Sequence, residues 1–161
     1  KRKDTNLINV KEDEEDDEDE EDEDEKDELL FTNNGIPYHG SRKIVYGAIP
    51  LLDDMLKDLD FTDPINLMVP VPQYIMRMYI DSCATGQPDL NLIQNIDFLS
   101  FLKLIDQYPT IYLSIDSLEI QLIRYMDRNH IVPDNQINEV LSKYHLRFMY
   151  LYLSGKLDIN I

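Results

Sequence analysis

The sequence contains one cysteine, Cys83, no tryptophan and only five scattered glycines. A single cysteine can form neither an intrachain disulfide nor a four-cysteine metal site, and this usage is typical of a reducing compartment. The glycines form no phosphate-binding loop, and no serine is flanked for a nucleophile elbow. No apolar stretch reaches the ~18 residues of a membrane span, and no charged-then-apolar signal peptide opens the given sequence. We therefore expect a soluble protein of the cytosol or nucleus.

Side chains for catalysis or metal binding are not grouped along the chain. The three histidines are far apart: His39, His130 and His145. None of them has a carboxylate or the cysteine at metal-ligand spacing. Residues 58–63 begin like a calcium loop, but Asp63 occupies the position of the required glycine and Val69 that of the bidentate glutamate. The sequence thus predicts no enzyme activity, no catalytic residue, no bound metal and no cofactor.

Negative charge is concentrated near the start of the chain. Residues 12–28 contain sixteen carboxylates and one lysine, and so carry −15 of the formal net charge of −17. Like charges at this density repel one another and bury no apolar area, so we expect residues 1–28 to be a disordered acidic tail. Two interpretations of this tail are open: a solubilising segment, or one that captures a basic partner.

The remaining residues, 29–161, have the composition of an ordinary folded domain. They contain 15 acidic and 10 basic residues, which are dispersed. About 133 residues are enough to bury one apolar core. Because phosphate contacts need clustered lysine and arginine, this dispersion disfavours direct binding of nucleic acid.

Two patterns in the first half predict β-structure. Residues 29–32 and 36–38 flank Asn33-Asn34-Gly35, whose Asn-Gly pair supplies the positive φ angles of a tight hairpin turn. Residues 67–71 are a short apolar run that is closed by Pro72, as expected of a buried strand.

Helical periodicity covers most of the rest. The sequence predicts two short helices within 44–59 that meet near Ile49, with Pro50 in the first turn of the second. Further helices are expected over 75–83, 98–105, 118–126 and 137–148, the last capped by Asp134 or Asn135. We expect one core that includes Leu52, Met55, Leu56, Leu102 and Leu122. The predicted class is α+β, with more helix than strand.

Several segments, in order, resemble BTB/POZ domains. These are SRKIVYGAIPLLDDML at 41–56, VPVP at 69–72, YIDSCATG at 79–86, LKLIDQY at 102–108 and the helix at 118–126. The first is similar to the two-helix signature of the superfamily, and the second to the strand end of its Skp-like cullin-ligase adaptors. The resemblance covers residues 29–130 and implies a BTB/POZ-like domain with short strands and a helical cluster, as a remote member.

The resemblance implies a protein–protein interaction module, either homodimerising or bridging a cullin-type ubiquitin ligase scaffold to a substrate receptor. Cullin-binding relatives often have an apolar-x-acidic element after the Thr-Gly turn, whereas residues 90–92 here are Leu-Asn-Leu, without the acid. Membership of a ubiquitin ligase is therefore less strongly implied than the fold.

Residues 131–161 form a predicted C-terminal helical extension, where Skp-type relatives present helices to their receptor. We expect four apolar and aromatic residues there to contact a partner: Tyr144, Phe148, Leu151 and Tyr152. The alternative is that they pack on the core of their own domain. A rival function of another class is an acidic, chaperone-like or assembly protein that binds basic proteins through its tail.

Overall fold

The computed structural model describes residues 28–50 and 64–159. These residues form six α-helices and a three-stranded mixed sheet, which confirms the α+β class. The strands are β1 (Glu28–Asn33), β2 (Ile36–Ser41) and β3 (Ile65–Asn66). The helices are α2 (Arg42–Ala48), α4 (Gln73–Thr85), α5 (Phe98–Gln107), α6 (Glu119–Arg128), α7 (Asn135–Leu141) and α8 (Arg147–Leu153). Three short 3-10 helices, η1 (Leu90–Leu92), η2 (Asn95–Asp97) and η3 (Ser142–Tyr144), complete the order.

Some expectations lie outside the described residues. The disordered tail expected over residues 1–28 is wrong at its last residue, because strand β1 begins at Glu28; residues 1–27 lie outside the described part of the chain. The second of the two helices expected within 44–59 falls in 51–63, as does the segment that resembles a calcium loop. Leu52, Met55 and Leu56 lie there too, whereas Leu102 and Leu122 are fully buried in the core.

The sheet begins with the predicted hairpin, which is confirmed. Strands β1 and β2 pair antiparallel with Asn33 opposite Ile36, and the two residues between them have φ angles of 53° at Asn34 and 77° at Gly35. Two consecutive positive φ angles are those of the turn that joins strands through two residues. Strand β3 pairs parallel with β1 on its other side, so the strand order is β2-β1-β3.

The strand predicted over 67–71 is wrong, and the reason is local. Strand β3 ends at Asn66, because β1 turns into the hairpin after Asn33 and leaves the residues that follow β3 without a neighbouring strand. The Asn33 side chain supplies hydrogen-bond partners instead: its Nδ2 donates to the carbonyl oxygens of Leu67 (3.0 Å) and Val69 (2.7 Å). Its Oδ1 accepts from the N–H of Val71 at 3.1 Å. Residues 67–71 therefore keep the alternating burial of a strand, but three of their backbone groups bond to the side-chain amide of Asn33 instead of to a neighbouring strand.

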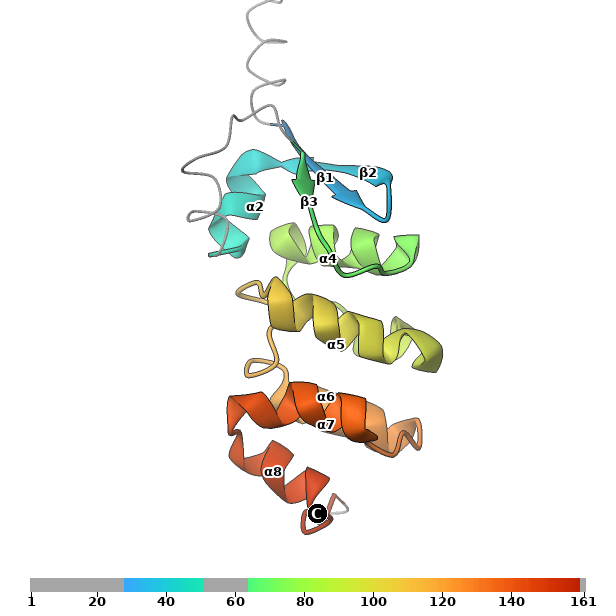
Figure 1. Cartoon of the computed structure of the whole chain (residues 1–161). Helices are drawn as coiled ribbons and strands as arrows, with labels where there is room; N and C mark the ends of the chain where they lie inside the picture. The colour runs from blue at the N-terminus through green and yellow to red at the C-terminus, as the bar shows by residue number, and fades with distance from the viewer. Residues whose placement is uncertain (1–27, 51–63, 160–161) are drawn as a thin grey trace, which may run out of the picture.

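The helices are stacked in layers below the sheet (Figure 1). Helix α4 lies directly beneath the strands and contacts α2 and β2, and α5 follows in the next layer. Below α5, helix α6 overlaps α7 in the view, and α8 lies at the far end beside the C-terminus. Contacts between α5 and α7 and between α6 and α8 join the lower layers.

The helices predicted in the middle of the chain are confirmed as α4, α5 and α6. On α4 the buried residues are Ile75, Met76, Tyr79, Ser82 and Cys83, while Met78 is half-buried. Cys83 is a core residue, and burial raises the pKa of its thiol to about 11.

Replacing Asn33 with alanine should destabilise the fold by about 3 kcal/mol. The change leaves two carbonyl oxygens and one N–H group buried without their partners, and each orphaned group costs about 1–3 kcal/mol. Urea denaturation followed by circular dichroism measures the loss. Asn66→Ala is the matched control, because this exposed amide bonds only Thr32 and Met68 and should cost within about 0.5 kcal/mol. Equal effects of the two changes would contradict the bridging role of Asn33.

Stability should also fall at alkaline pH in a way that depends on Cys83. Its thiol pKa is raised from the ordinary 9.0 to about 11, so between these values the unfolded chain loses a proton that the folded chain keeps. Ionisation then favours the unfolded state: stability is at its full value below pH 9 and declines toward pH 11. In Cys83→Ala the melting temperature should decline less steeply over this window. Parallel curves for the variant and the wild type would refute the assignment.

Candidate functional site

The C-terminal extension, residues 131–161, is the predicted site for a partner. It contains two helices, α7 and α8, where the sequence predicts one. The single helix expected through Tyr144 and Phe148 is wrong, because α7 ends at Leu141 and α8 begins at Arg147. The predicted cap is confirmed, since the Asp134 side chain accepts from the N–H of Ile137 at 2.9 Å. The break falls at His145, which has a left-handed φ of 51°. A histidine tolerates this conformation better than β-branched residues do.

The first anchor of the broken segment is Asp106 on α5. One carboxylate oxygen accepts a hydrogen bond from the Tyr144 hydroxyl, and the other lies 3.1 Å from Nζ of Lys143. Burial, and then the hydrogen bond to Asp106, raise the pKa of Tyr144 well above its ordinary value. Tyr144, one of the residues expected to meet a partner, thus ties η3 to α5 in its own domain.

The second anchor is Glu119 in the first turn of α6. Its Oε2 accepts a hydrogen bond of 2.9 Å from the backbone N–H of Met149, in the first turn of α8. The first N–H groups of a helix have no partner within the helix, and a negative charge at that end is favourable. No side chain of α8's own N-cap residue, Leu146, supplies this bond. Glu119 therefore caps α8 from a neighbouring helix.

Helix α8 has an inner and an outer side. Met149 is fully buried, and Tyr152 and Leu153, which lie within about one residue's rotation of it, pack partly buried against the core. Burial raises the pKa of Tyr152. On the flanks Phe148 remains 46% and Tyr150 64% exposed.

The structure thus divides the four expected partner residues into two groups. Tyr144 and Tyr152 face their own domain, whereas Phe148 lies on the flank of α8 and the half-buried Leu151 on the side opposite Met149. Tyr150 is not among the partner residues that the sequence predicts. The signal was available, because residues one step either side of a buried position on a helix are turned by 100° from it. Together, Arg147, Phe148, Tyr150 and Leu151 are called here the outer face of α8.

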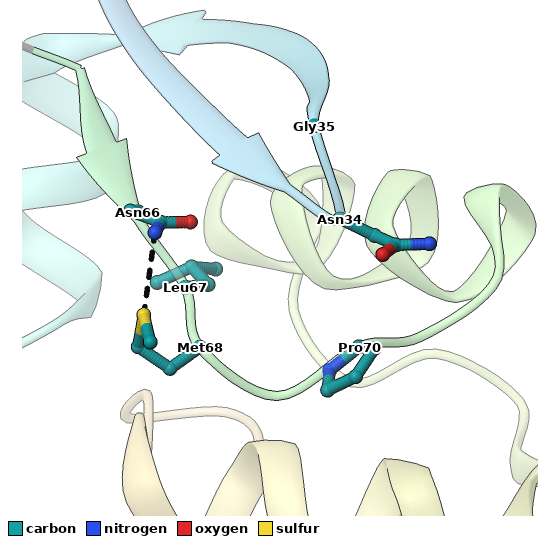
Figure 2. A pocket seen from close by; sticks show the side chains of 6 residues that line it. All are labelled: Asn34, Gly35, Asn66, Leu67, Met68 and Pro70. Atoms are coloured by element: carbon teal, nitrogen blue, oxygen red, sulfur yellow. Dashed lines mark hydrogen bonds between the residues drawn. The ribbon is translucent and has the colours of Figure 1, made fainter.

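A hollow of about 260 Å³ lies where the hairpin turn meets the end of β3 (Figure 2). Six residues line it: Asn34, Gly35, Asn66, Leu67, Met68 and Pro70. Asn66 Nδ2 donates to Met68 Sδ at 3.2 Å, as the dashed line in Figure 2 marks. None of the six side chains is titratable or nucleophilic, so the hollow offers no group for acid–base or covalent chemistry.

A second hollow, of about 200 Å³, lies between β2 and α4 and is lined in part by Tyr38 and Ile80. His39, Arg77 and Asp81 on its rim are exposed to solvent. Within residues 28–50 and 64–159, no three histidine, cysteine or carboxylate side chains gather as they would around a metal ion. In the same part of the chain, no helix has the length and apolar character to cross a membrane.

Comparison with known proteins gives no relative for the chain. No protein-family model matches it, and no curated protein or solved structure does. The BTB/POZ resemblance stays a prediction.

Removing the Glu119 carboxylate should loosen α8 without unfolding the domain. Glu119→Ala leaves the Met149 N–H without its acceptor, and the loss of a helix cap costs about 1 kcal/mol. Hydrogen exchange at the amides of Arg147–Leu153 should accelerate, measured by mass spectrometry. Glu119→Gln is the matched variant, because its amide oxygen still accepts a hydrogen bond and should restore most of the protection. Equal exchange in all three proteins would show that Met149 packing alone holds α8.

Proposed function

We propose that this protein is a protein–protein interaction module of BTB/Skp type that presents α8 to a partner. The observation that carries the proposal is the pair of exposed aromatic side chains, Phe148 and Tyr150, on a helix whose only charged residue is Arg147. Aromatic residues and arginine are enriched where proteins bind each other. A short helix that buries Met149 and leaves large rings in water has apolar area available for another chain.

Two further observations support an interaction role. The resemblance to BTB/POZ domains covers residues 29–130, and it implies that the extension corresponds to the region where Skp-type relatives contact their receptor. The hollow of Figure 2 is lined by neutral side chains, which suits packing better than catalysis. The partner is either a second copy of this chain or, in an adaptor, a receptor that the domain bridges to a cullin-type scaffold.

The acidic run favours a second candidate function. Sixteen carboxylates within residues 12–28 attract basic proteins over a distance of about 10 Å at ordinary salt. In this alternative, the protein is an acidic assembly factor, and the folded part serves as a platform. Salt separates the two, because a complex held by the run weakens steeply as salt rises, whereas one held by apolar contacts does not.

Aspartates at Phe148 and Tyr150 should abolish association. Both side chains are exposed, so the double variant should keep the circular dichroism spectrum of the wild type, while two carboxylates disrupt an apolar contact. Association is measured by light scattering at high concentration, for self-association, and by quantitative pull-down from the source cell. The matched control is Ile96→Asp with Val132→Asp, two side chains that are 85% exposed elsewhere on the surface.

The outcomes discriminate clearly between the functions. Loss of partners in the α8 variant but not in the control supports the proposal. If the wild type is monomeric and both variants retain the same partners, α8 is only a brace and the proposal is wrong. Partners that disappear on deletion of residues 1–27, and on addition of salt, support the acidic assembly factor instead.

A further inference from the structure

Positive charge surrounds the outer face of α8. Residues 142–156 contain three cations, Lys143, Arg147 and Lys156, and no aspartate or glutamate, in a protein with a net charge of −17. All three of these side chains are exposed. Their spacing places cations before, within and after a helix that also exposes two aromatic rings.

Two acids beside this segment are already engaged within the domain. Asp106 is engaged by Lys143 and Tyr144, and the Glu119 carboxylate accepts from the N–H of Met149. Within the described part of the chain, neither Arg147 nor Lys156 has a carboxylate within 4.0 Å. Two cations therefore remain available to a ligand on either side of the exposed rings.

We propose that the outer face of α8, with Lys156, binds an acidic segment of a partner protein that also carries large apolar side chains. This inference rests on the proposed function and names the chemistry of its partner. Phe148 and Tyr150 supply apolar area, and Arg147 and Lys156 supply charge complementary to carboxylates. Arginine pairs with a carboxylate through two parallel N–H groups, which gives direction as well as attraction.

The acidic run of this chain has the carboxylates that such a segment needs but not the apolar side chains. Residues 12–28 consist of aspartate, glutamate and one lysine, and contain no apolar side chain to cover the two rings. Exposed ion pairs alone contribute little, and their main effect is on specificity and rate of association. The segment that fits this face therefore has carboxylates and apolar anchors together.

Three fluorescein-labelled peptides of equal length test the inference by fluorescence anisotropy with the full chain. The first has glutamates on one face of a helix and leucines on the other; the second has glutamine in place of glutamate; the third has serine in place of leucine. The first should bind, more weakly as salt rises, and the other two should bind at least about tenfold more weakly. If all three bind alike, the inference is wrong.

Charge reversal locates the binding face. Arg147→Glu with Lys156→Glu should weaken binding of the first peptide at least about tenfold. Lys103→Glu with Arg124→Glu, two exposed cations on α5 and α6, changes the net charge equally and should have little effect. If both double variants weaken binding equally, peptide binding depends only on the overall charge of the protein and the inference is wrong.

The result is separable from that of the proposed function. If aspartates at Phe148 and Tyr150 abolish association while the acidic and glutamine peptides bind alike, α8 is still a docking face but not for an acidic segment. If the deletion of residues 1–27 makes all three peptides bind tightly, the face has no preference for acid and the inference is overturned.

Discussion

The Asn33 side chain is the interaction on which the upper half of the molecule depends. The backbone of a parallel strand needs hydrogen-bond partners along its whole length. Strand β1 ends in a tight turn after Asn33, whereas the chain after β3 continues toward α4 and still needs such partners. An amide has both donors and an acceptor, so it can replace one stretch of peptide backbone. Asn33 is fully buried and reaches Leu67, Val69 and Val71. By fixing this segment, it sets where α4 begins beneath the sheet.

Buried tyrosines perform a similar task between the lower layers. The Tyr79 hydroxyl on α4 donates to the carbonyl oxygen of Tyr108 at 2.7 Å, just after α5. On α6, the Tyr125 hydroxyl donates to the carbonyl oxygen of Ile93 at 2.6 Å, while its ring stacks on Phe98 at 4.7 Å. A carbonyl in an irregular loop has no ladder partner and is costly to bury alone. Each ring thus fills the core, and its hydroxyl satisfies a loop carbonyl oxygen. These two hydrogen bonds fix the position of one helical layer relative to the next.

The sequence predicted what depends on local pattern and missed what depends on partners distant in the chain. The hairpin followed from Asn34-Gly35, and α4, α5 and α6 followed from apolar spacing, because both signals lie within a few residues. The strand over 67–71 had the right burial pattern but lacked a backbone partner, which only the position of the turn reveals. In the same way, the pattern through Val140, Tyr144 and Phe148 is helical, but the segments on either side of the break at His145 are held by Asp106, 38 residues before Tyr144, and by Glu119, 30 residues before Met149. Of the predicted partner residues, Phe148 and Leu151 lie on the outer face, and this division could not be read from a continuous helix.

Helix α8 is held differently from the helices above it, and this difference bears on function. Helices α4, α5 and α6 bury four or five side chains each, whereas α8 buries only Met149 fully. Its position therefore relies on two carboxylates, and hydrogen bonds to charged groups are stronger than neutral ones. Those carboxylates lie on the inner side, whereas the cations Arg147 and Lys156 and the rings of Phe148 and Tyr150 are exposed to solvent. The arrangement that keeps this weakly buried helix in place thus leaves its outer face exposed to solvent, as the proposed docking requires.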